Sequence, residues 1–218
     1  MPPGRPSIVS VNVGLPRTVE WRGEEVSTAI FKSPVEGAVR VGALNLDGDR
    51  QADPEVHGGT YKAVYLYPAE HYAAWHAQLG ALAWGAFGEN LTTTGLLEDE
   101  VRVGDRLRAG TALLVVTQPR FPCFKLGIRF GRPDVEKRFL RDGLTGFYAA
   151  VAGEGEVRAG DAITVVERAA HPVTIAEVVS LYASKRPDRE RLARAAGLPA
   201  LPDRLRQKFQ RKLGALDA

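Results

Sequence analysis

The single cysteine of the chain, Cys123, has the sequence surroundings that most favour chemistry. It lies in the stretch TQPRFPCFKLG, residues 117–127, with Arg120 three residues before it and Lys125 two residues after it. A thiolate is both a nucleophile and a soft metal ligand, and nearby cations favour it over the thiol. Two prolines of the same stretch restrict the backbone and could hold the sulfur in one direction. The competing interpretation is a small buried hydrophobic residue.

A second segment, EVHGGTYKAVYLY at residues 55–67, has features of an anion-binding loop. Gly58 and Gly59 let backbone N–H groups approach a ligand closely, and Lys62 could neutralise its charge. The simpler alternative is a loop that enters a strand, with His57 at the surface.

Two further segments carry side chains that could bind a ligand. In AFGENLTTTG, residues 86–95, Glu89 offers an acceptor and Asn90 an amide that can both donate and accept. An ordinary turn explains the same residues. In GLTGFYAAV, residues 143–151, an aromatic pair follows two glycines. Aromatic residues in a strand more often belong to the core than to a ligand site.

Short strands dominate the pattern of residues 7–167, which predicts a barrel or a curled mixed sheet. Residues 19–31 predict a hairpin with Gly23 near its tip, and the alternation in AVRVGALNL, residues 38–46, predicts another strand. Helices are expected at residues 68–80 and 132–143, where a proline lies near the start and a glycine at the end.

The sequence pattern changes after residue 170, which divides the chain into an expected barrel domain, residues 1–170, and a helical extension, residues 171–218. Three short amphipathic helices are predicted in the extension, and they would dock on the barrel because they bury little surface alone. Ten Lys/Arg and five Asp/Glu give it a charge of +5, against −2 for the remainder. A basic surface could bind nucleic acid or an acidic partner, but few aromatic residues are present for base stacking. Nucleic acid is therefore not expected as a partner, and a solvated helical face is the simpler interpretation.

Composition excludes several classes of protein. One cysteine excludes an intramolecular disulfide and any zinc or iron–sulfur site built from several cysteines of this chain. No signal-peptide pattern and no run of roughly 18 apolar residues is present, so we expect a cytoplasmic protein without a membrane partner.

Four motifs of this chain, taken in order, resemble those of the MOSC-domain family. They are HGG with a downstream lysine, FGENL, QPRFPCFKL and GLTGFY…GEVRAGD. The resemblance is to its YiiM-like branch, the bacterial 6-hydroxylaminopurine-resistance proteins. It runs from the first strands to about residue 167, and the three-helix tail is similar to the C-terminal extension of that branch.

This resemblance implies a mainly β fold with inserted helices (α+β), in which a MOSC-type β-barrel precedes a C-terminal three-helix extension. It also implies the molybdenum cofactor (Mo-molybdopterin), with Cys123 as the catalytic residue and the protein ligand to the metal. Pyridoxal phosphate is not expected. The positions that match the family's contacts to the pterin and its phosphate are His57, Gly58, Gly59, Lys62, Glu89, Asn90, Arg120 and Lys125.

The activity implied is reduction of small N-hydroxylated substrates, such as N-hydroxylated nucleobases, in a detoxification role. An external electron donor or reductase would be its partner, because the chain shows no iron–sulfur, flavin or nicotinamide motif. Two alternatives stay open: a persulfide sulfur carrier or sulfurtransferase that uses Cys123, and a non-enzymatic binding module that uses the basic tail. A homodimer is also left open.

Overall fold

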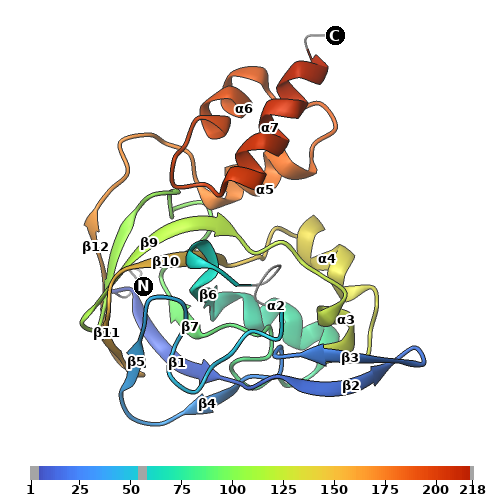
Figure 1. Ribbon diagram of the computed structural model, residues 1–218, viewed down its shortest axis with the longest axis vertical. Helices are drawn as coiled ribbons and strands as arrows, with labels where there is room; N and C mark the ends of the chain where they lie inside the picture. Colours follow the sequence, from blue (N-terminus) through green and yellow to red (C-terminus); the bar gives the residue numbers. More distant parts are fainter. Residues whose placement is uncertain (1–4, 54–57, 217–218) are drawn as a thin grey trace.

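A strongly curved eight-stranded sheet forms the centre of the molecule (Figure 1). The computed structural model describes residues 5–53 and 58–216. The strands of this sheet are β1 (Ser7–Val13), β4 (Ser33–Val35), β6 (Val64–Pro68), β7 (Leu91–Thr94), β8 (Arg106–Ala109), β9 (Ala112–Pro119), β10 (Phe147–Gly153) and β12 (Ile163–Glu167). Their order is β12-β8-β9-β10-β6-β7-β1-β4, and β6 and β7 form the parallel pair. A parallel pair needs a crossover connection, which here contains a helix.

Two small sheets flank the main one. They pair β2 (Arg17–Trp21) with β3 (Glu24–Thr28), and β5 (Val39–Val41) with β11 (Gly155–Val157). The predicted hairpin is confirmed: Arg22 and Gly23 lie between β2 and β3 with φ of 56° and 82°. Positive φ at both central residues gives the turn a twist that matches the strands.

The prediction of one strand over residues 38–46 was wrong beyond its first part. After β5 the chain turns back, because Gly42 N donates to Asn45 O at 2.9 Å. Leu46 then pairs with Val41 in an isolated bridge. The alternating pattern therefore belongs to a strand and a tight turn. Val41 and Leu46 reach the core, whereas Leu44 in the turn is exposed.

The predicted mainly β fold with inserted helices is confirmed, and its sheet takes the curled form rather than that of a closed barrel among the described residues. Near the start of β1, Ser7 and Ala162 form a single bridge, Ile8 N donates to Asp161 O at 2.9 Å and Ile163 N donates to Pro6 O at 2.7 Å. Within the described residues no continuous ladder joins the edge strands β4 and β12. The sheet is curled and barrel-like, and a few bonds rather than a full strand pair hold its ends together.

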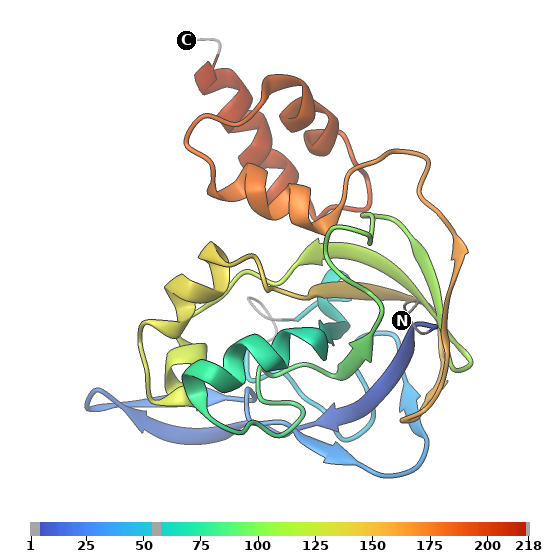
Figure 2. The same cartoon turned by 180° about the vertical axis from the view of Figure 1, so that it is seen from behind.

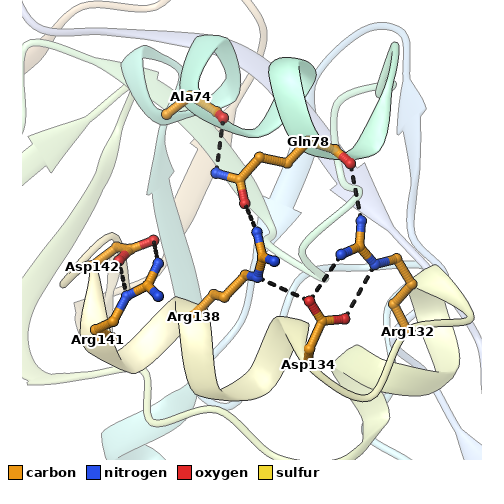
Figure 3. A network of polar contacts seen from close by, with 7 residues as sticks. All are labelled: Ala74, Gln78, Arg132, Asp134, Arg138, Arg141 and Asp142. Carbon is orange, nitrogen blue, oxygen red and sulfur yellow. Dashed lines mark hydrogen bonds and ion pairs between the residues drawn. The ribbon is translucent and has the colours of Figure 1, made fainter.

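Three helices lie beside the sheet: α2 (Glu70–Leu79), α3 (Lys125–Phe130) and α4 (Val135–Arg141). The helices α2 and α4 confirm the two predicted insertions, and Figure 2 shows α2 from its exposed side. Polar contacts tie them together (Figure 3): Arg138 Nη1 donates to Gln78 Oε1 at 2.5 Å, and Arg132 Nη1 donates to Gln78 O at 3.0 Å. Asp134 binds both arginines.

An aromatic cluster fills the space between these helices and the sheet. Tyr67, Trp75, Phe87 and Phe139 are almost fully buried, and the ring centroids of Tyr67 and Phe87 stack 4.6 Å apart. Trp75 Nε1 donates to the Tyr67 hydroxyl at 2.8 Å, so the buried indole N–H is satisfied. This cluster gives the neighbouring loops a rigid base.

The basic tail forms the three predicted helices, α5 (Ile175–Ala183), α6 (Arg189–Ala196) and α7 (Asp203–Leu216). Asp188 is the N-cap of α6 as expected, since its side chain accepts from Arg191 N at 2.9 Å. The helices stand at one end of the sheet, orange and red in Figure 1, and α5 packs against β9. Their apolar residues, such as Val178 and Phe209, share one core cluster with Leu107 and Val116 of the sheet.

Candidate active site

Cys123 lies in the short loop between β9 and α3. Its thiol is free and half-buried, and its carbonyl oxygen accepts from Leu126 N at 2.9 Å as α3 begins. At the other end of the loop, Arg120 N donates to Gly146 O at 3.4 Å. The loop is therefore anchored on both sides, with the sulfur at the boundary between two cavities.

The first of these cavities, which we call the basic cavity, has an empty volume of about 580 Å³ including its mouth. Its wall contains Cys123 and five cationic side chains: Lys32, Arg50, Lys62, Arg120 and Lys125. Of the described residues, no Asp or Glu lines it. The size suits a small organic ligand, and the excess of cationic side chains in the wall favours an anionic one.

Arg120 is the most unusual cation of this wall. It is only 6% exposed, and its Nη1 is buried without a hydrogen-bond partner among the described residues. Its guanidinium carbon lies 5.3 Å from the ring centroid of Tyr65 and 5.1 Å from that of Phe139. These aromatic faces stabilise the cation but accept no conventional hydrogen bond from Nη1. An anion that entered the cavity could accept that bond.

Lys62, from the 3-10 turn η1 (Thr60–Lys62), contributes to both cavities. Burial lowers the pKa of Lys62 below its ordinary value, and the nearby guanidinium of Arg204 lowers it further. Cys123 acts electrostatically in the opposite direction. Lys62, Arg204 and Cys123 therefore lie close together, although they come from three separate parts of the chain.

Asn90 and Lys32 are held in the wall by one buried carboxylate. Asp49 accepts from Lys32 Nζ at 2.6 Å, from Asn90 Nδ2 at 2.9 Å and from Gly14 N at 2.9 Å. Burial lowers the pKa of Lys32, and Asp49 opposes this shift. The Asn90 carbonyl accepts from Tyr65 N at 3.1 Å. Asn90 thus reaches the cavity but mainly positions its neighbours.

Two tyrosines add phenol groups to the same wall. Burial raises the pKa of Tyr148, and the nearby Arg120 only partly offsets this. Burial also raises the pKa of Tyr65, whose hydroxyl donates to Thr145 O at 2.8 Å. Both groups stay protonated near neutral pH, and Tyr148 also lines the second cavity.

Glu89 differs from the expectation of a cofactor contact, because it is 0% exposed and lies behind the wall. It accepts from the Tyr72 hydroxyl at 2.5 Å, Gly85 N at 2.8 Å, Phe87 N at 3.1 Å and Thr92 Oγ1 at 2.8 Å. These bonds occupy both carboxyl oxygens. Its position is that of a structural residue that fixes the turn before β7.

The sequence-predicted residues therefore fall into four groups, of which the buried Glu89 behind the wall is one. Lys62, Asn90, Arg120, Cys123 and Lys125 share the wall of the basic cavity. Gly58 and Gly59 are described but do not line it, and Gly59, at φ 88°, starts η1. His57 lies outside the described residues.

The second cavity, which we call the tail groove, lies between the Cys123 loop and α7. Its empty volume is about 1640 Å³ including open solvent, and Lys62, Cys123 and Tyr148 belong to both cavities. Phe121 and Tyr182 stack in the groove with ring centroids 4.0 Å apart. Pockets at junctions between structural units are common places for ligands.

Sequence reasoning missed several residues of the two cavities. Lys32, Arg50 and Tyr65 lie in unremarkable strand or loop patterns, so only the fold reveals them. The strand pattern around Tyr148 indicated a core residue rather than a ligand contact. In contrast, Arg204, Lys208 and Arg211 have i, i+4 and i+7 spacing, which places them on one face of a predicted helix. That spacing is the sequence feature that could have identified these three cations as one surface.

No helix among the described residues is long and apolar enough to span a membrane. The described residues also contain no group of three or more His, Cys, Asp or Glu side chains placed to hold a metal ion. Cys123 would thus be a single protein ligand to any metal carried into the cavity by an organic group.

Comparisons with known proteins agree with this architecture. The MOSC domain family matches residues 53–164, and the YiiM-like three-helix domain family matches residues 173–214. Protein YiiM of Escherichia coli is 38% identical over 188 residues, which are 83% of this chain and 84% of that protein. The crystal structure of YiiM from Geobacillus stearothermophilus has a TM-score of 0.81 and 38% identity, over 95% of this chain and 99% of that one.

A protein of Gibberella moniliformis named as a reductase is 39% identical over 151 residues. These residues are 67% of this chain but only 27% of that longer protein. Its other parts therefore have no counterpart in this match.

Proposed function

This chain belongs to the MOSC-domain family and carries the YiiM-like three-helix domain, and we propose that it is a molybdenum-cofactor-dependent reductase of N-hydroxylated compounds such as N-hydroxylated nucleobases. The observation that carries the proposal is the pairing of Cys123 with the unsatisfied, buried Arg120 in one basic wall. The family and the relative named as a reductase support an oxidoreductase.

The donor set of the basic cavity fits the cofactor. Molybdenum is thiophilic, and Cys123 offers a soft sulfur ligand. The phosphate of the pterin is an anion, and Arg120 offers a planar guanidinium with an unsatisfied N–H. Lys125 and Arg50 add charge without a neighbouring carboxylate in the wall. A neutral apolar ligand would leave all of these groups unpaired.

In the proposed reaction, the hydroxylamine R–NH–OH takes up two electrons and two protons and gives the amine R–NH₂ and water. The cofactor, when bound, supplies the two-electron redox chemistry. Cys123 would hold the metal, Arg120 would bind the phosphate, and Tyr148, kept protonated by burial, would donate a hydrogen bond to the oxygen of the N–O bond.

Electrons must come from outside this chain. A single cysteine cannot hold an iron–sulfur cluster, and the sequence has no flavin or nicotinamide motif. We therefore include a separate electron donor or reductase in the proposal. Its chemical identity does not affect the test below, because a chemical reductant can replace it.

The test uses protein purified from a host that makes the molybdenum cofactor. Wild type is expected to contain near-stoichiometric molybdenum and a pterin that fluoresces after oxidation, and to reduce an N-hydroxylated purine with a chemical reductant. Cys123→Ala should lose at least about 100-fold in kcat/KM, since the metal loses its protein ligand. Lys185→Ala, at an exposed position of the tail, is the control and should match wild type.

Full activity in molybdenum-free protein would contradict the proposal. Mass spectrometry after incubation with a cysteine desulfurase separates the sulfur-carrier alternative, which requires an added sulfur on Cys123. A metal-free protein with that modification would be a carrier rather than the reductase proposed here.

A further inference from the structure

The tail groove is a second built site beside Cys123, and the reaction proposed above does not by itself explain its charge. We propose that it binds the ribose phosphate of the substrate, so that the substrates are N-hydroxylated nucleotides rather than free bases. This inference rests on the proposed function, because it specifies the substrate class of the same site.

The floor of the groove suits a planar, partly apolar group. Phe121 and Pro122 come from the Cys123 loop, and Tyr182 and Leu205 come from the helical tail. The stacked rings of Phe121 and Tyr182 join the two parts of the molecule at this point. Apolar and aromatic walls can pack against the flat faces of nucleobases and sugars whatever the base.

One face of α7 supplies the cations of the groove. Arg204, Lys208 and Arg211 line it at i, i+4 and i+7, and no Asp or Glu of the described residues does so. No ion pair joins these three to a carboxylate in the described part of the chain. Lys208 Nζ instead lies 3.6 Å from the ring centroid of Tyr182, at the edge of the apolar floor.

Lys212 lies on the same helix but has a structural role. Its Nζ donates to the carbonyl oxygens of Leu181, Tyr182 and Ser184 at 2.9, 2.7 and 2.8 Å. These bonds satisfy the C-terminal carbonyls of α5 and fix α7 against it. Among the described residues, no comparable set of backbone bonds holds Arg204, Lys208 or Arg211 in place, so these three cations differ from Lys212.

The direction of the cation row also fits a nucleotide. Arg204 lines the groove together with Lys62 and Cys123, so the row of cations begins in the cavity that the sulfur-bearing loop also lines. From Arg204 the helix runs on for seven residues to Arg211, a rise of about 10 Å at 1.5 Å per residue. We place the base beside Cys123 and its ribose phosphate along this row, because Cys123 and the three cations line the same groove.

The basic cavity retains enough cations for the cofactor. Lys32, Arg50, Arg120 and Lys125 line that cavity and not the groove. Lys62 belongs to both. Two anionic groups can therefore bind in the two cavities that Cys123 lines, each with its own arginine and lysine partners.

The experiment compares 6-N-hydroxyadenosine 5′-monophosphate, the corresponding nucleoside and the free base on cofactor-loaded enzyme. We expect kcat/KM to be at least tenfold higher for the monophosphate. Lys208→Ala and Arg211→Ala should each raise KM for the monophosphate about tenfold, as loss of one charge-assisted contact does, and leave kcat and the kinetics of the free base unchanged. Lys185→Ala, an exposed tail lysine outside both cavities, is the matched control.

A binding measurement gives a readout that is independent of turnover. By calorimetry, wild-type holoenzyme should bind adenosine 5′-monophosphate at least tenfold more tightly than adenosine, and the two α7 variants should lose the difference. If the free base is reduced as well as the monophosphate and neither variant matters, the inference is overturned while the proposed function stands. If nothing is reduced, the proposed function fails, and calorimetry alone decides whether the groove binds nucleotides.

Discussion

At the scale of single residues, the charge of the basic cavity depends on groups whose burial costs stability. Arg120 is buried with one unsatisfied nitrogen, which is an unfavourable arrangement in the absence of a ligand. Glu89 is equally buried but has every oxygen bonded within the protein. The unsatisfied nitrogen of Arg120 therefore indicates a ligand-binding role, whereas the fully bonded carboxyl group of Glu89 indicates a structural one.

Replacement of Arg120 by methionine tests this distinction. Arg120→Met should reduce the molybdenum and pterin content of purified protein at least tenfold, because the phosphate loses its guanidinium partner. The free energy of unfolding of the cofactor-free variant should be unchanged or raised by up to about 3 kcal/mol, since an apolar side chain replaces a buried guanidinium that has an unsatisfied nitrogen. Elemental analysis and urea denaturation measure the two quantities, and Arg141→Met, on an exposed surface, serves as control.

Glu89→Gln should give the converse result. The new amide would place a donor against an N–H or O–H donor that now bonds to a carboxyl oxygen, so we expect a loss of about 1–3 kcal/mol in unfolding free energy. A variant as stable as wild type but without cofactor would show that Glu89 binds the ligand directly.

At the scale of elements, the connection between sheet and tail contains a titratable group. His171 Nδ1 accepts from Val173 N at 3.2 Å, two residues before α5. Burial lowers the pKa of His171 below its ordinary value of 6.5, and Arg102 and Arg194 lower it further, whereas Asp105 and Glu177 act in the opposite direction. The neutral ring is the form that accepts this hydrogen bond.

Acid should therefore weaken this connection. A depressed pKa means that the folded state resists protonation, so the stabilising contribution is complete above about pH 6.5. It is lost as the pH falls from there through the lowered pKa. His171→Asn keeps an acceptor for Val173 N but does not titrate. Thermal unfolding between pH 7 and pH 5 should show a steeper decline for wild type, and parallel profiles would exclude the effect.

At the scale of the whole molecule, the sheet and the helical tail share one hydrophobic core cluster, although they match two domain families. The core cluster runs without a break from the sheet into α5, α6 and α7. Phe121 and Tyr182 extend this contact to the edge of the tail groove. The groove exists only while both parts are in place.

Truncation after residue 170 should consequently fail to give a stable sheet domain. Removal of the tail exposes a large apolar patch of β9 and its neighbours, and such patches promote aggregation. We expect the full chain to unfold in one cooperative transition by calorimetry and the truncated chain to aggregate or lose that transition. A soluble truncated protein with an unchanged midpoint would show two independent domains.

The sequence determined the local structure and the central chemical group. Period-two strands, the hairpin at Gly23, the cap at Asp188 and the amphipathic tail helices follow from short-range rules and were confirmed. Cys123 with its neighbouring cation Arg120 was also recognisable, because proline, charge and thiol lie within a few residues.

Only the tertiary structure decided what meets Cys123 from elsewhere. Lys32, Arg50, Lys62 and Tyr148 reach one cavity from four distant segments, and α7 brings its cations into a groove that Cys123 also lines. The fold also placed Glu89 behind the wall and left the sheet without a closing ladder. Such contacts depend on how a curled sheet and a docked helix bring remote residues together, and no pattern of a few residues encodes that.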